Sequence, residues 1–411
     1  MTTKPDAALP PAFARLGWSN LSAQFSEQIA LAAAPLAAVL LLGAGAVETG
    51  LLQTAQTLPF LLLSLPAGVL ADRMSRRRLM AGSEALRAAS LLAILCLLAG
   101  DLLNLWLLGA LGFIGAIGTV CYSVAAPALL PSIVLRAQLG LANRWLELAR
   151  SVAYAAGPAI GGAIVGWTDA SSAYVIATVL SLLAVVLLAG LREDARVDVA
   201  RRHPLAELRE GAAFVVSHPL LCPILATAVF FNAAWFVLQA VYVAYAIQNL
   251  GLTATGVGLT LGAYGAGMIA GAVAAPYLVQ RLSYGAMITA GPLAGLGGSL
   301  VMLATLSLPS GVIAGVSFFL FGAGPILWTI TTTTLRQAVT PLAMLGRVSA
   351  VVMTATFGAR PLGAAIGAIV ATRYGVAACL MIAAAGFLIQ FVVIAASPVP
   401  RLRTLPEPEP A

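Results

Sequence analysis

The stretch that decides the fold is Gly68-Val-Leu-Ala-Asp72-Arg73-Met-Ser75-Arg76-Arg77-Arg78, which separates apolar runs at 47–71 and 79–99. Four arginines between two apolar runs indicate a short cytoplasmic loop joining two membrane spans. The acidic residue Asp72 is not needed to place this loop in the cytoplasm, so its presence calls for another explanation. Its carboxylate can complement the positive end of a neighbouring helix. We therefore predict a cytoplasmic latch, with an arginine loop that only fixes topology as the alternative.

The composition supports a membrane protein. Of 411 residues, 61% are hydrophobic and 9% charged, and the mean hydropathy is +0.98. A soluble domain has about 45–50% apolar and about 25% charged residues. The composition excludes a soluble globular enzyme, a disordered protein and a nucleic-acid binder. The net charge of +7 is then a feature of membrane topology.

Apolar runs recur along the whole chain and are long enough to span a bilayer. Such runs must be helical, because lipid offers no hydrogen-bond partner to the backbone. We predict an all-α membrane protein with twelve transmembrane helices in two six-helix bundles. The predicted spans are 17–43, 47–71, 79–99, 103–130, 141–167, 170–190, 219–247, 256–279, 285–307, 310–335, 345–372 and 375–396.

The charges between spans predict the orientation. Basic residues gather in alternate loops and in the tail, whereas the other loops hold Glu48, Asp101 and Asp169, with Arg373 as their one basic residue. The positive-inside rule places both termini in the cytoplasm. The first residues lack an apolar segment with a cleavage site, so we expect no removable signal peptide. The expected location is the cytoplasmic membrane.

The chain divides into two halves, 1–190 and 219–396, joined by a linker at 191–218 and followed by a tail at 397–411 that we expect to be disordered. Within the linker, 204–216 is either a solvated tether, which we favour, or an amphipathic helix on the membrane surface. A shared offset of 203 residues relates Arg144 and Pro158 to Arg347 and Pro361. Two parallel repeats are typical of transporters, with the substrate site between them near the midplane.

The arginine loop resembles the signature of the major facilitator superfamily, although Ser75 stands where that family usually has glycine. The resemblance implies a latch whose partner is the start of the eleventh span, near residues 345–349. The expected latch residues are Gly68, Asp72, Arg73, Arg76 and Arg77.

A second motif, Gly157-Pro158-Ala-Ile-Gly161-Gly162 in the fifth span, resembles the antiporter motif of proton-coupled exporters in that superfamily. Glycine and proline allow close helix contact and a bend, so a generic helix contact is the alternative. Together with Ser22–Glu27, Leu58-Pro59 and Glu84–Arg87, the motifs resemble a branch that exports macrolides, enterobactin and other small molecules.

Two charged residues inside predicted spans are candidates for chemistry. A carboxylate at the depth of Glu27 is costly and suggests a functional site, here for proton coupling or a cationic substrate. The alternative is a structural partner for a basic group such as Arg360. Arg360 is either packed against carbonyls or a carboxylate, or binds an anionic substrate group.

Further polar and aromatic residues are candidates for a transport cavity, with helix packing as the alternative. Asn232, Trp235 and Gln239 share one helix face. Two pairs at i,i+3 spacing, Glu84–Arg87 and Glu147–Arg150, are expected to be local ion pairs, with a gating network as the alternative. The predicted cavity-lining residues are Gln24, Gln53, Gln56, Asn232, Trp235, Gln239 and Trp328.

No enzyme signature is present. The sequence has no phosphate-binding GxxxxGK[ST] loop, and its four cysteines and two histidines lack metal-ligand spacing. We therefore expect no cofactor, no metal and no catalytic activity. The predicted function is proton-coupled export of drugs, antibiotics or other small amphiphilic molecules by a monomer in the lipid bilayer. The alternatives are a dedicated siderophore or metabolite exporter, a lysophospholipid flippase, and a non-transporting receptor.

Overall fold

The computed structural model describes residues 9–135, 138–191, 204–341 and 344–406. The described chain is helical throughout, as predicted. Its α-helices are α1 (Pro11–Leu42), α2 (Ala46–Arg73), α3 (Arg76–Ala99), α4 (Leu105–Leu129), α5 (Leu139–Trp167), α6 (Ala170–Ala189), α7 (Pro204–Ser217), α8 (Leu221–Gln248), α9 (Ala254–Val279), α10 (Tyr284–Ala304), α11 (Gly311–Val339) and α12 (Leu345–Ala395).

Polar side chains at loop positions start several of these helices. The first N–H groups of a helix lack backbone partners, so a side-chain oxygen that accepts from one of them fixes the start. Asn104 accepts from Leu107 N, Asp169 from Ser172 N, and Thr253 from Gly256 N. These caps mark where α4, α6 and α9 begin after short connections.

The helix α12 is two spans in one continuous element. At about 1.5 Å per residue, its 51 residues would be more than twice the thickness of a hydrocarbon core of about 30 Å. Gly375 interrupts it with φ 76° and ψ 179°, a conformation that glycine adopts readily. Cys379 Sγ lies 3.4 Å from Gly367 O, so the chain folds back at this point. The predicted boundary between 372 and 375 falls at this break.

Ten helices in the described part of the chain are long and apolar enough to cross a membrane. The helix α2 is not among them, since the set covers only described residues and part of α2 between positions 65 and 73 lies outside them. With α2, and with α12 divided at Gly375, the helices match the twelve predicted spans.

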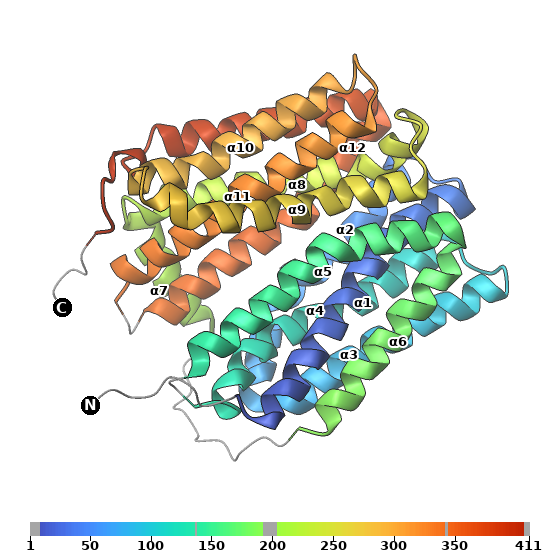
Figure 1. Ribbon diagram of the computed structural model, residues 1–411, viewed down its shortest axis with the longest axis horizontal. Coiled ribbons are helices and arrows are strands. Elements are labelled where there is room, and N and C mark those ends of the chain that lie inside the picture. The colour runs from blue at the N-terminus through green and yellow to red at the C-terminus, as the bar shows by residue number, and fades with distance from the viewer. Residues whose placement is uncertain (1–8, 136–137, 192–203, 342–343, 407–411) are drawn as a thin grey trace.

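The helices lie in two groups that pack side by side (Figure 1). In one group α1 packs on α5 and α6, and α3 packs on α4 and α6. In the other, α8 packs on α12, and α11 packs on α9 and α10. The contacts that join the groups are mainly α5 with α9 and α2 with α12. The start of α1, the helix α7 and the last described turn lie at the same end of the molecule (Figure 1).

The linker and the tail are more ordered than we expected. The favoured tether is wrong for residues 204–217, which form α7. This helix packs against the start of α12 through Val215 and Val348, and Glu210 pairs with Arg347. The disordered tail is wrong for its first part, because Leu402 O and Arg403 O accept hydrogen bonds from Gly285 N and Tyr284 N. Residues 407–411 lie outside the described part.

Candidate functional site

A cavity of about 240 Å³ lies between the two groups of helices. Residues from α1, α2, α3, α4, α5 and α6 line it on one side, and residues from α8, α9, α11 and α12 on the other. Its charged lining residues are Glu27, Arg87 and Arg360. A central cavity shared by both groups is where a transporter of this architecture binds its substrate.

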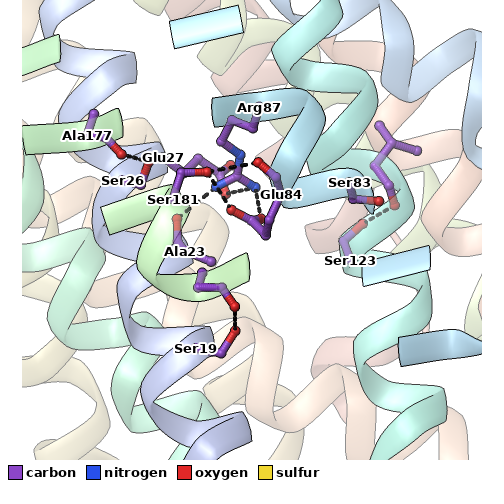
Figure 2. A network of polar contacts seen from close by, with 12 residues as sticks. Ser19, Ala23, Ser26, Glu27, Ser83, Glu84, Arg87, Ser123, Ala177 and Ser181 are labelled. Atoms are coloured by element: carbon purple, nitrogen blue, oxygen red, sulfur yellow. Dashed lines mark hydrogen bonds and ion pairs between the residues drawn. The ribbon is translucent and has the colours of Figure 1, made fainter. Parts of the chain in front are cut away.

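A buried charge cluster forms one wall of this cavity. Arg87 Nη2 lies 2.9 Å from Glu84 Oε1 and 3.9 Å from Glu27 Oε2. The Glu84 side chain is 0% exposed, the Arg87 side chain 5%, and the Glu27 side chain 17%. Figure 2 shows the Arg87 guanidinium between the two carboxylates. Two carboxylates therefore share one guanidinium, and only Glu27 reaches the cavity.

Hydrogen bonds between helices fix this cluster in place. Arg87 donates to Ala23 O of α1 at 2.8 Å, and Ser181 of α6 donates to Glu84 Oε2 at 3.0 Å. The helix α1 is held on α6 because Ser26 donates to Ala177 O at 2.7 Å (Figure 2). The side chains of α1, α3 and α6 are thus locked together before any ligand binds.

The sequence prediction for this cluster was partly right. Glu84 and Arg87 form the predicted local pair. Glu27, however, faces Arg87 and not Arg360, the partner we had named. Arg87 also lines the cavity, whereas Glu84 is fully buried behind it.

Arg360 occupies the opposite side of the cavity and has a different environment. Its Nε donates to Asn232 Oδ1 at 3.2 Å. Its guanidinium carbon lies 4.0 Å from the centre of the Phe357 ring, 5.5 Å from that of Phe236 and 5.6 Å from that of Phe60. Among the described residues, none forms an ion pair with Arg360. The charge is thus held by rings and one amide, within reach of the cavity.

The predicted cavity-lining residues divide into two sets. Gln53, Gln56, Trp235 and Gln239 line the cavity. Asn232 lies behind it and binds Arg360. Gln24 and Trp328 are not among the lining residues, and Trp328 packs against Gly291 of α10 instead.

Several lining residues were not predicted as such. Tyr154, Phe60, Phe236, Tyr264 and Phe318 contribute aromatic surface. Their spacing in apolar helices matches that of packed core residues, so the sequence offers no signal that separates the two. Gln28 also lines the cavity, and its Nε2 is buried without a hydrogen-bond partner in the described structure.

The arginine loop is described only in part. The helix α2 extends to Arg73, and the surroundings of Gly68 and the side chains of Asp72 and Arg73 lie outside the described part. Ser75 accepts a hydrogen bond from Arg78 N and so caps α3. The serine that stands where the family usually has glycine therefore has a structural role. Arg77 donates to Ala189 O at 2.9 Å, at the end of α6, and Arg76 lies in the first turn of α3.

The fifth-span motif lies at two close helix contacts. A Cβ on Gly157 would be 2.5 Å from Gln28 Cβ, and one on Gly161 would be 3.2 Å from Ile29 O, both on α1. A Cβ on Gly162 would be 2.6 Å from Gly258 Cα on α9. Pro158 lines the cavity. One face of α5 thus packs closely on α1, and another face packs closely on α9 of the other helix group.

Comparisons with known proteins agree with this architecture. A family model described as "Transmembrane secretion effector" matches residues 12–408. Macrolide efflux protein A of Streptococcus pyogenes is 23% identical over 331 residues, 78% of this chain and 79% of the relative. The enterobactin exporter EntS of Citrobacter koseri is 28% identical over 291 residues, 69% of this chain and 67% of the relative.

A solved structure shows the same fold. The crystal structure of a bacterial homologue of the iron transporter ferroportin in its inward-facing state has a TM-score of 0.74 and 17% sequence identity. The match covers 95% of this chain and 99% of that structure. At this identity the likeness concerns the fold alone.

Proposed function

Because the chain belongs to the transmembrane secretion effector family of major facilitator transporters, we propose that it exports small amphiphilic molecules across the cytoplasmic membrane by alternating access. Residues 1–190 would rock against residues 219–396, with both termini in the cytoplasm. The observation that carries the proposal is the cavity between the two groups, which has Glu27 in its wall. The two relatives reported above are named as an efflux protein and an exporter.

The charge cluster supports proton coupling through Glu27. Arg87 can balance one carboxylate, and it holds the fully buried Glu84 at the shorter distance. A second ionised carboxylate in a low-dielectric wall is costly. A proton on Glu27 leaves Glu84 and Arg87 as a balanced pair. Glu27 also faces the cavity, so a proton or a cationic substrate group can reach it.

The latch belongs to the same proposal. A Cβ on Gly50 of α2 would lie 2.8 Å from Ala368 Cβ of α12, and Phe60 stacks edge-on with Phe357 at 5.6 Å. Residue numbers therefore rise along α2 while those of its contacts fall along α12, so the two helices run antiparallel. The numbers of two contacting residues add up to about 418. Continued to the end of α2, the same register would bring position 72 opposite the first turn of α12. We propose that Gly68, Asp72, Arg73, Arg76 and Arg77 steady this end of the molecule during the cycle.

The experiment that tests the function uses purified protein in proteoliposomes with an imposed pH gradient and a panel of lipophilic cationic dyes. Wild type should move dye against its gradient, and Glu27→Gln should lose this coupling. Glu147→Gln is the matched control, because Glu147 pairs with Arg150 at the exposed part of α5. Coupled transport retained in Glu27→Gln would refute the role of Glu27. Loss of transport in both variants would point to general damage.

A further inference from the structure

Arg360 is the second arginine of the cavity wall, and it lies apart from the charge cluster around Arg87. The two carboxylates of the cluster, Glu27 and Glu84, already share Arg87. In the described part of the chain, no carboxylate completes an ion pair with Arg360. Among the described residues, Arg360 donates one hydrogen bond, from Nε to Asn232, and its two terminal nitrogens donate none.

The three phenylalanine rings around Arg360 have no oxygen or nitrogen that could accept a hydrogen bond from its guanidinium. Aromatic rings interact with a guanidinium through its faces, whereas its N–H groups point outward in its plane. Phe357, at 4.0 Å, lies closest to the guanidinium carbon. A planar guanidinium held in this way is suited to a bidentate contact with a planar or tetrahedral anion.

The rest of the cavity suits an aromatic body beside that anion. The ring centres of Trp235 and Tyr264 lie 5.1 Å apart, and those of Trp235 and Phe318, which meet edge to face, lie 5.6 Å apart. All three line the same cavity as Arg360. A small cavity with aromatic walls and few polar groups is typical of sites for amphiphilic ligands.

We propose that Arg360 is the anion-binding group of the substrate site, and that the site takes small aromatic anions whose ring packs against Trp235, Tyr264 and Phe318. This inference rests on the proposed export. It implies that anionic substrates are driven out by a different force from cationic ones. A proton on Glu27 and an anion on Arg360 favour each other, whereas a proton and a cation compete. If the proton stays on Glu27 throughout the cycle, export of an anion moves net negative charge and so draws on the membrane potential, which is negative inside, rather than on exchange for a proton.

The test compares two probes with the same ring system and permanent, opposite charges. They are 2-naphthalenesulfonate and 2-naphthyltrimethylammonium, measured by equilibrium dialysis with purified protein. The variants are Arg360→Gln, Arg360→Lys and, as the control, Arg373→Gln, which removes an exposed arginine from the same helix. Wild type and Arg373→Gln should bind the sulfonate equally. Arg360→Gln should bind it at least tenfold more weakly, and Arg360→Lys should lie between them.

Two results would overturn the anion site. One is sulfonate binding within twofold of wild type in Arg360→Gln. The other is a wild-type preference for the ammonium probe. Unchanged binding of the ammonium probe by Arg360→Gln would show that this variant is folded. If added phosphatidylglycerol displaces the sulfonate, the ligand is a lipid headgroup and the aromatic-anion assignment is wrong.

Transport separates this inference from the proposed function. In phosphatidylcholine liposomes, a potassium diffusion potential should drive sulfonate movement by wild type without a pH gradient. If wild type binds the sulfonate but moves neither probe under either gradient, export is refuted and the anion site stands. If the ammonium probe moves and the sulfonate neither binds nor moves, export stands and the anion site is refuted.

Discussion

At the residue scale, the central fact is that one guanidinium serves two carboxylates. Arg87 lies 2.9 Å from Glu84 and 3.9 Å from Glu27, and hydrogen bonds from Ser181 and to Ala23 O hold the assembly. The two carboxylates therefore differ in their burial and in their distance from Arg87. Glu84 is a buried structural counterion, whereas Glu27 faces the cavity and can exchange its partner.

This difference predicts how the cluster responds to charge removal. Arg87→Gln leaves the fully buried Glu84 without a cation, which costs about 3–5 kcal/mol for a broken buried pair. Glu84→Gln combined with Arg87→Gln removes both charges and should recover most of that loss. Thermal unfolding of the detergent-purified wild type and of these two variants checks this. A double variant no more stable than Arg87→Gln would contradict the pairing.

Residue-scale predictions from the sequence succeeded where local spacing decides the outcome. The i,i+3 pair of Glu84 and Arg87 follows from helix geometry alone. The partner of Glu27 depends on how α1 and α3 are rotated about their axes, which a single sequence does not specify. The same reason explains why Trp235 lines the cavity while Trp328 packs against α10.

At the element scale, glycines decide how closely α5 and α9 approach. The Cβ that alanine would add at Gly162 meets backbone atoms of Gly258 and Ala254 at 2.6 and 2.7 Å. Backbone cannot move aside as a flexible side chain can. The two helices would have to separate, and this contact joins the two helix groups.

We therefore expect Gly162→Ala to lower the initial rate of transport in proteoliposomes by at least tenfold. Gly297→Ala on α10 is the control, because a Cβ there meets nothing within 4 Å. Alanine is the better helix former at both positions by about 1 kcal/mol, so propensity does not explain a loss. Equal rates for the two variants would show that the close approach is not required.

At the scale of the whole molecule, α5 and α9 also allow the relative motion of the halves to be tested. A Cβ on Gly262 would lie 3.0 Å from Ala159 Cβ, a few tenths of an ångström short of the usual range of about 3.5–4.5 Å in disulfides. Oxidation of Ala159→Cys with Gly262→Cys, in a background lacking the four native cysteines, should stop transport, and reduction should restore it. Each single cysteine variant should be insensitive to oxidant. Full transport by the cross-linked protein would contradict rocking of the halves.

The sequence predicted much of the whole-molecule plan. Apolar runs located the helices, because a bilayer allows no other way to satisfy the backbone in those runs. The family resemblance is confirmed by the match over residues 12–408. The helix at 204–217 was only the alternative prediction and the order in 397–403 was missed, since both arise from packing on α12 and α10 and not from local composition. Proton coupling, substrate class and the latch stay predictions.

The turn at Gly375 has a mechanical consequence. A single residue joins the two segments of α12, and no slack connects them. The first segment carries Arg360 into the cavity, and the second packs on α10 through Gln390, which donates to Pro292 O. A shift of the Arg360 segment is therefore transmitted directly to the outer wall of its group. We expect the two segments of α12 to move together, because only Gly375 separates them.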